Sequence, residues 1–191
     1  MAPSSLSGHF LIAGKNLRDP NFFQSVVLMI EHNDQGAMGL VINRPAGLTV
    51  SKVLEGHFDL PDTNMQVYAG GPVERSALFI LHDSGDYDPS QSSVVPGLYV
   101  GNSAEIFENV VRRAVSGDDN LKFRIYAGCS GWAPNQLEQE LERGDWLVTK
   151  AQMELVFHED PYAVWDLLMK EVHQAPALPV TPHIPPAPEW N

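Results

Sequence analysis

The segment Ser25–Pro45, SVVLMIEHNDQGAMGLVINRP, contains two apolar runs separated by a polar turn. The runs, 25–30 and 37–42, are too short for helices and include β-branched residues, which is typical of strands covered on both faces. The residues NDQG between them have the composition of a tight turn. The segment therefore predicts an antiparallel hairpin at the centre of a sheet, with His32 near the mouth of its turn.

Three residues in the second half of this hairpin have special properties. Gly39 has no side chain to pack, which predicts a bulge or a close approach by another backbone. Pro45 cannot donate a ladder hydrogen bond, so it ends the strand and leaves Arg44 at the strand end. A guanidinium group there is suited to binding a carboxylate or phosphate. The alternative is that Arg44 neutralises acidic neighbours in a chain of net charge -12.

The rest of the chain alternates short strands with helices. Further strands are predicted at 10–13, 66–69, 77–81, 122–126 and 146–148, and helices at 49–54, 103–116, 135–142 and from residue 160. We expect a single α/β (α+β) domain with a mixed, largely antiparallel sheet flanked by helices. It spans residues 9–173, between a flexible N-terminus, 1–8, and a proline-rich, mobile tail, 174–191.

Composition excludes several classes of function. The chain has 24 acidic and 12 basic residues and no run of Lys or Arg, so direct nucleic-acid binding is disfavoured. It contains no apolar stretch long enough to span a membrane and no secretory signal, and its single cysteine, Cys129, is typical of a reducing compartment. We expect a cytoplasmic protein. No motif for a metal or a cofactor is present.

One segment has the strand, turn and helix order of a nucleophile elbow. Strand 122–126 is followed by GCSGW, 128–132, and then by a helix near Pro134. The G-x-S-x-G motif is broken because Trp132 replaces its last glycine. Ser130, or as a weaker alternative Cys129, is the candidate nucleophile; either is also explained as a turn residue or a buried core residue.

The same segment offers two further interpretations. Glycines before a helix expose backbone N–H groups that favour an anion. On that helix, Gln136 and Glu140 lie one turn apart, and either line a cleft or bond to neighbouring backbone. His32 and His82 are at strand ends, where each is a candidate base or a structural residue.

Four motifs in order resemble the AlgH/YqgE family of bacterial proteins: LIAGKNLRDPNFFQSVVLMIEHNDQGAMGLVINRP, VYAGGPVERSALFILH, YVGNS and GCSGWAPNQLEQELERGDWLV. The resemblance covers residues 8 to about 169. It implies an α/β fold with a mixed sheet, a cytosolic location and no settled biochemical activity. The family name is associated with regulation of alginate production, without a mechanism.

Our leading hypothesis is a non-enzymatic binding or regulatory protein. Its ligand is a small anion, or an acidic or aromatic group on a protein partner. The alternative is a hydrolase or acyl transferase that uses Ser130 with His32 or His82 as base. The third hypothesis is a transcriptional regulator. Direct DNA binding by such a regulator conflicts with the net charge of -12. The predicted ligand-binding residues are Asn43, Arg44, Gly70, Gly71, His82, Gly131, Trp132 and Gln136. The oligomeric state is not predicted.

Overall fold

The computed structural model describes residues 5–55, 64–86, 93–117 and 120–174. Within these ranges, nine strands form one connected sheet. The strands are β1 (His9–Ala13), β2 (Val26–Asn33), β3 (Gly36–Val41), β4 (Pro45–Thr49), β5 (Gln66–Ala69), β6 (Val73–His82), β7 (Tyr99–Gly101), β8 (Phe123–Trp132) and β9 (Trp146–Lys150). The tail predicted to be mobile lies outside the described residues beyond Gln174.

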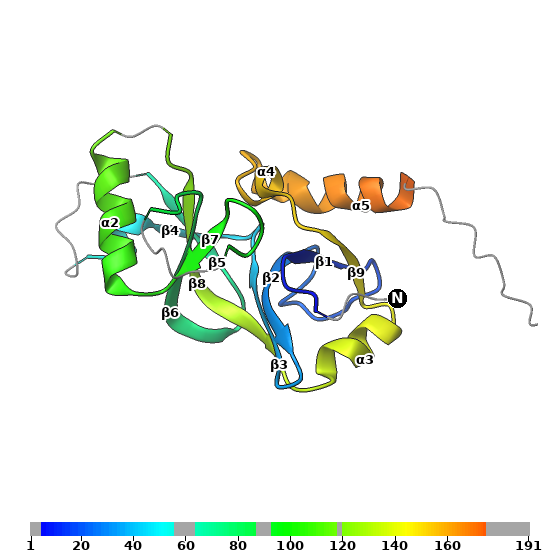
Figure 1. The fold of residues 1–191 in the computed structure, drawn as a ribbon. Helices are drawn as coiled ribbons and strands as arrows, with labels where there is room; N and C mark the ends of the chain where they lie inside the picture. The colour runs from blue at the N-terminus through cyan, green and yellow to red at the C-terminus, as the bar shows by residue number, and fades with distance from the viewer. Residues whose placement is uncertain (1–4, 56–63, 87–92, 118–119, 175–191) are drawn as a thin grey trace, which may run out of the picture.

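Five helices and one 3-10 turn flank the sheet in the described ranges (Figure 1). They are α1 (Val50–Val53), α2 (Ala104–Val115), α3 (Gln136–Glu142), α4 (Met153–Val156), the 3-10 turn Pro161–Ala163 and α5 (Val164–Gln174). Ser103 caps α2, since its hydroxyl accepts a hydrogen bond from Ile106 N–H. The predicted fold class, a single α/β domain with a mixed, largely antiparallel sheet, is confirmed.

The central hairpin is confirmed by the pairing of β2 with β3. Val27 lies opposite Val41, and Asn33 lies opposite Gly36 at the turn. The register shifts between Met29 and Glu31, beside Gly39. A Cβ on Gly39 would lie 2.7 Å from Leu28 O, so the predicted close approach by another backbone is also confirmed.

Strand β8 joins two halves of the sheet, and this strand corrects one expectation from the sequence. At Ile125, β8 runs between β5, which is parallel, and β6, which is antiparallel. Past this point it continues to Trp132 and pairs with β3, with Ser130 opposite Gly39. The segment 128–132 is therefore strand and not the turn of a nucleophile elbow, because the β2–β3 hairpin supplies a partner for its backbone.

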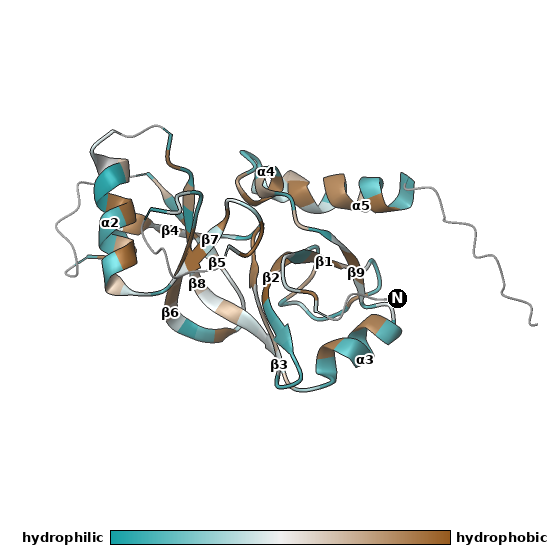
Figure 2. Ribbon diagram, in the orientation of Figure 1, coloured by the Kyte–Doolittle hydropathy of each residue, from teal (hydrophilic) through white to brown (hydrophobic). Residues whose placement is uncertain are grey.

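Each half of the sheet has its own helical cover (Figure 1). One half, in the order β8-β3-β2-β1-β9, lies between α3 and the chain containing α4 and α5; the other, β4-β5-β8-β6-β7, is covered by α2. In Figure 2 the helices carry apolar and polar faces, as expected for helices with one buried side. On β8, the adjacent residues Ile125 and Tyr126 point to opposite faces of the sheet, and both are buried.

Candidate functional site

A pocket of about 260 Å³ lies where the loop between β1 and β2, residues 14–25, meets the starts of β4 and β6. We call it the Arg44 pocket. It lies beside the turn between β5 and β6 and has Ala127 of β8 at its base. Its lining consists of Asn21, Val41, Arg44, Ala46, Ala69, Gly71, Pro72, Arg75 and Ala127.

Arg44 is held in this pocket by the loop. Its guanidinium donates one hydrogen bond to the carbonyl of Asn21 at 2.5 Å and another to the carbonyl of Phe23 at 2.9 Å. A guanidinium has five N–H donors, so three are left for a ligand. Because carbonyls fix the planar group from one side, the remaining donors have a defined direction.

The neighbouring residue, Asn43, holds the end of the same loop through hydrogen bonds of its side-chain amide. Its side-chain oxygen accepts the Val26 N–H at 2.8 Å, and its side-chain N–H donates to Gln24 O at 2.9 Å. Gln24 has φ of 52°, a conformation that non-glycine residues rarely adopt and that surrounding contacts must maintain. Asn43 is buried, and in this structure its amide positions the loop beside Arg44.

The glycines predicted for the site allow two backbones to lie close together. A Cβ on Gly71, whose φ is 153°, would lie 2.2 Å from Cys129 O, and a Cβ on Gly70 would lie 2.3 Å from Gly128 O. Only glycine permits this approach of the β5–β6 turn to β8. Gly71 lines the pocket, whereas Gly70 lies behind it and donates its N–H to Ala127 O.

The pocket concentrates positive charge in an acidic protein. Arg44 and Arg75 both line it, and no Asp or Glu does. Among the described residues, neither guanidinium forms an ion pair with a carboxylate. The alternative interpretation of Arg44, as a neutraliser of acidic neighbours, therefore finds no partner in the described chain. Two cations without counter-charges are suited to an anionic group.

Trp132 and Gln136, also predicted for the site, belong to a different arrangement, which we call the Glu140 cluster. One oxygen of Glu140 accepts both indole N–H groups, from Trp132 and from Trp146, at 2.8 Å each. The other accepts from Gln136, whose own side-chain oxygen accepts the Ala133 N–H. The cluster ties α3 to the sheet, and neither Trp132 nor Gln136 lines the Arg44 pocket.

His82 lies at the end of β6, outside the lining of the Arg44 pocket. It pairs with Phe123, seven residues before Ser130 on β8, and seven strand residues span roughly 20 Å. Its ring stacks on Tyr99 with centroids 5.7 Å apart. Burial lowers the pKa of the His82 imidazole, against the opposing effects of the Ser84 backbone and Asp83. His82 is therefore not brought together with Ser130, and it does not line the Arg44 pocket.

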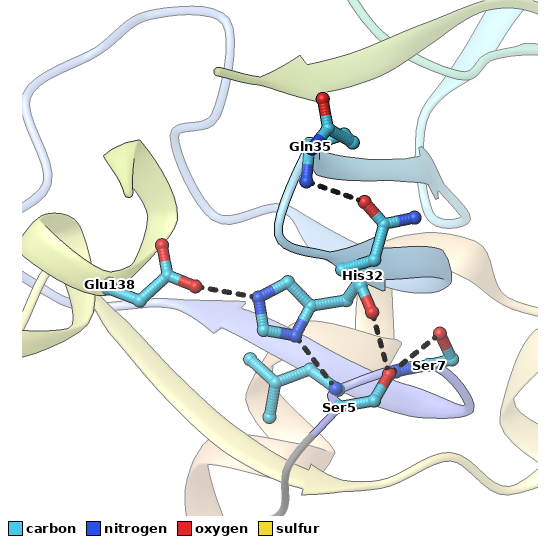
Figure 3. A network of polar contacts seen from close by, with 7 residues as sticks. Ser5, Ser7, His32, Gln35 and Glu138 are labelled. Carbon is cyan, nitrogen blue, oxygen red and sulfur yellow. Dashed lines mark hydrogen bonds and ion pairs between the residues drawn. The ribbon is translucent and has the colours of Figure 1, made fainter. Parts of the chain in front are cut away.

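His32 is occupied in a network with the start of the chain (Figure 3). Its Nδ1 accepts the Leu6 N–H at 3.0 Å, so its Nε2 carries the proton that is donated to Glu138 at 2.8 Å. The hydroxyl of Ser5 donates to the His32 carbonyl. Both ring nitrogens are used, and residues 5–8, within the predicted flexible N-terminus, are held against β2 and α3; residues 1–4 lie outside the described chain.

The candidate nucleophiles lie inside strand β8. Ser130 is fully buried, and its hydroxyl donates to Gly70 O at 3.2 Å. Cys129 is buried as well, and burial, together with the charge of Glu74, raises the pKa of its thiol. Gly131 pairs with Met38, so its backbone serves the sheet instead of an exposed anion-binding turn. Both candidate nucleophiles therefore lie inside the sheet, and His82 pairs with the opposite end of β8.

Sequence reasoning missed several residues of the pocket. Arg75 was not singled out, although it is one of only 12 basic residues and follows the Gly-Gly-Pro turn by three positions. Asn21 and the three alanines of the lining carry no chemical motif. Their small size leaves the space open, and only the tertiary arrangement brings them together.

The described ranges contain neither a cluster of side chains suited to a metal ion nor a helix suited to a bilayer. Within them, no group of three or more His, Cys, Asp or Glu side chains is placed to hold a metal ion. None of the helices in the described part of the chain is both long enough and apolar enough to cross a bilayer.

The sequence and the fold are similar to those of known bacterial proteins. A family model described as AlgH-like matches residues 10–177. A UPF0301 protein of Myxococcus xanthus is 37% identical over 177 residues, which cover 91% of this chain and 94% of the relative. A UPF0301 protein of Thioalkalivibrio sulfidiphilus is 39% identical over 168 residues, which cover 86% of this chain and 88% of the relative.

Two solved structures have a similar fold. The solution structure of AlgH from Pseudomonas aeruginosa has a TM-score of 0.71 at 35% identity and covers 93% of each chain. A crystal structure of a protein from Corynebacterium diphtheriae has a TM-score of 0.70 at 26% identity and covers 87% of this chain and 86% of its own.

Proposed function

The chain belongs to the AlgH-like family, and for this member we propose a non-enzymatic binding function at the Arg44 pocket. The ligand is a carboxylate or phosphate group, carried by a small molecule or by a protein partner. The observation that supports this most strongly is the pair of guanidinium groups, Arg44 and Arg75, that line the pocket without an acidic residue.

The preorganised loop adds to this support. Asn43 and Arg44 together hold the backbone of residues 21–26 by four hydrogen bonds. A guanidinium already oriented by carbonyl groups loses less conformational entropy when it binds an anion. The arrangement therefore favours tight binding of an anion that approaches Arg44 from the direction of its remaining N–H donors.

The chemistry of the lining favours binding over catalysis. Its side chains are apolar, an amide and two guanidinium groups, and arginine does not take up or release protons at physiological pH. The pocket is thus suited to holding charge, whereas general acid–base or nucleophilic chemistry requires groups of another kind. Its volume of about 260 Å³ accommodates an anionic group and a short attached chain.

The net charge of -12 disfavours nucleic acid as the ligand. An acidic chain repels a nucleic-acid backbone, so we propose no direct DNA binding, and a regulatory role then acts through a ligand or a protein partner. An oligonucleotide duplex that binds at low salt, with an affinity that falls steeply as salt rises, would contradict this part of the proposal.

The proposed function is tested by calorimetry and thermal shift with phosphate, pyrophosphate, citrate and nucleoside monophosphates. A ligand at about 100 times its Kd stabilises the native protein by about 2.7 kcal/mol. We expect Arg75→Gln to weaken binding at least tenfold. Lys150→Gln makes the same charge change on exposed β9 and is the matched control. Equal effects of the two variants, or anion binding that neither changes, would overturn the assignment.

A further inference from the structure

A second pocket lies on the other part of the loop that Arg44 holds. It has a volume of about 650 Å³, and its lining consists entirely of residues from this loop: Lys15, Asn16, Leu17, Arg18, Pro20 and Phe23. Two of these are basic and none is acidic. The loop's own carboxylate, Asp19, is not part of the lining and accepts hydrogen bonds from the backbone and side-chain N–H groups of Asn21.

Two consecutive phenylalanines of this loop have different surroundings. The side chain of the preceding residue, Phe22, packs against Trp132 and Trp146, with ring centroids 6.1 and 5.3 Å apart. The next residue, Phe23, is held by its carbonyl, which accepts a hydrogen bond from Arg44. Its side chain remains 60% exposed, which leaves a large apolar group between basic side chains.

The loop between β1 and β2 contributes residues to both pockets. Arg44 contacts the backbone of Asn21, which lines the first pocket, and of Phe23, which lines the second. We call the combined surface the basic loop face and define it by Lys15, Arg18, Phe23, Arg44 and Arg75. These four cations are one third of the chain's 12 basic residues, and no Asp or Glu lines either pocket.

We propose that the basic loop face docks an acidic peptide segment of a partner protein that carries a large apolar side chain. This inference rests on the proposed function, because one carboxylate of the segment occupies the Arg44 pocket. Further carboxylates pair with Lys15 and Arg18, and the apolar side chain packs on Phe23. Arginine and exposed aromatic residues are the groups that contribute most at protein interfaces.

A peptide fits this surface better than a free small molecule does. The second pocket has walls from one loop only, so a small ligand there is covered from one side. Small-molecule sites usually bury most of their ligand. An extended segment instead gains affinity by contacting both pockets at once, and its negative charges are attracted to the four cations of this face.

The test uses three short fluorescein-labelled peptides and fluorescence anisotropy. One is a run of Asp and Glu with a central Phe, the second has Ser in place of that Phe, and the third has Asn and Gln in place of the acidic residues. We expect the first peptide to bind more tightly than either of the others, by about tenfold for each lost interaction, which corresponds to about 1.4 kcal/mol. Its binding should weaken as salt rises.

Four variants assign the contacts. Arg18→Glu should weaken the acidic Phe peptide at least tenfold, and Phe23→Ser should abolish the preference for Phe over Ser in the peptide. Lys150→Glu and Tyr162→Ser are matched controls, because Tyr162 is an aromatic residue that is 73% exposed elsewhere. Both controls should bind the peptides as the unmodified protein does.

The outcomes separate this inference from the proposed function. If small anions bind through Arg75 but no peptide binds, or if Phe23→Ser leaves peptide binding unchanged, the inference is overturned and the anion pocket stands. If a nucleoside monophosphate binds with dependence on Phe23 while the peptides do not, the occupant is a small molecule and the inference is again overturned. If Arg75→Gln affects neither small anions nor peptides, both proposals are overturned.

Discussion

The Arg44 pocket and the Glu140 cluster both collect polar residues that the sequence suggested for a single site, and they differ in how their hydrogen bonds are used. In the Glu140 cluster, one carboxylate accepts from Trp132, Trp146 and Gln136, so both of its oxygens are occupied. In the Arg44 pocket, two guanidinium groups have no carboxylate partner among the described residues.

This difference separates structural polar residues from candidate binding residues. A polar group whose partners lie within the protein contributes to stability, and its removal leaves those partners unsatisfied. A charged group that is oriented but not neutralised keeps its capacity for a ligand. Substitutions in the two regions should therefore have opposite consequences, with stability lost in one and ligand affinity lost in the other.

The largest effect on stability is expected at the Glu140 cluster. Glu140→Ala leaves two partly buried indole N–H groups without their acceptor and should lower the free energy of unfolding by about 2–3 kcal/mol. Urea denaturation followed by tryptophan fluorescence measures this loss. Glu142→Ala, at an exposed position of the same helix, is the control and should change the value by less than about 0.5 kcal/mol. Equal losses would show that α3 is sensitive to any substitution.

A smaller loss of stability is expected at Arg44, which takes part in both kinds of interaction. The sequence predicts that Arg44→Ala abolishes ligand binding and leaves the fold intact. Its hydrogen bonds to Asn21 and Phe23 add a structural contribution, so we expect a loss of about 1–2 kcal/mol together with the loss of anion binding. Hydrogen exchange should show faster exchange confined to residues 14–26. Exchange unchanged in this loop would contradict the holding role.

Arg75 should sharpen the comparison, because its side chain is exposed and holds no other element in the described structure. Arg75→Gln should leave the free energy of unfolding within about 0.5 kcal/mol of the unmodified protein while anion affinity falls. Urea denaturation beside calorimetry separates the two quantities. A large loss of unfolding free energy would show that Arg75 is a structural residue and not only a candidate binding residue.

The smallest effect concerns pH. The hydrogen bond from His32 lowers the pKa of Glu138 below its ordinary value of 4.5. A lowered pKa stabilises the folded state above pH 4.5, and this contribution disappears as the pH falls through the folded-state value. Because the Glu138 side chain is 46% exposed, we expect less than about 1 kcal/mol. Glu138→Gln should reduce the loss of unfolding free energy between pH 5 and pH 3 by this amount. An unchanged loss in the variant would contradict a stabilising role of the His32–Glu138 pair.

Local patterns predicted much of the fold. The apolar runs beside the NDQG turn were sufficient for the β2–β3 hairpin, and three-and-four spacing was sufficient for α2. The end of β8 was missed because GCSGW has turn composition. Its extended backbone is stabilised by β3, a partner that is about 90 residues earlier in the chain and that no local pattern identifies.

The candidate site was predicted only in part, for the same reason. Arg44 and Gly71 line the same pocket, whereas His82, Trp132 and Gln136, which the sequence grouped with them, lie outside its lining. Arg75 was not named at all. Sequence motifs identify residues with special chemistry, but a motif does not say whether a polar side chain is satisfied by a neighbour.

The sequence by itself determined the hairpin, the fold class and the acidic character of the protein, because periodicity, turn chemistry and charge are properties of neighbouring residues or of the whole composition. The tertiary structure alone decided which polar groups became structural. Glu140 accepts hydrogen bonds from two indole N–H groups, and Arg44 donates to two backbone carbonyls. Arg75 forms no ion pair with a carboxylate in the described chain. Hydrogen bonding depends on distances of about 3 Å between residues far apart in sequence, and only folding sets those distances.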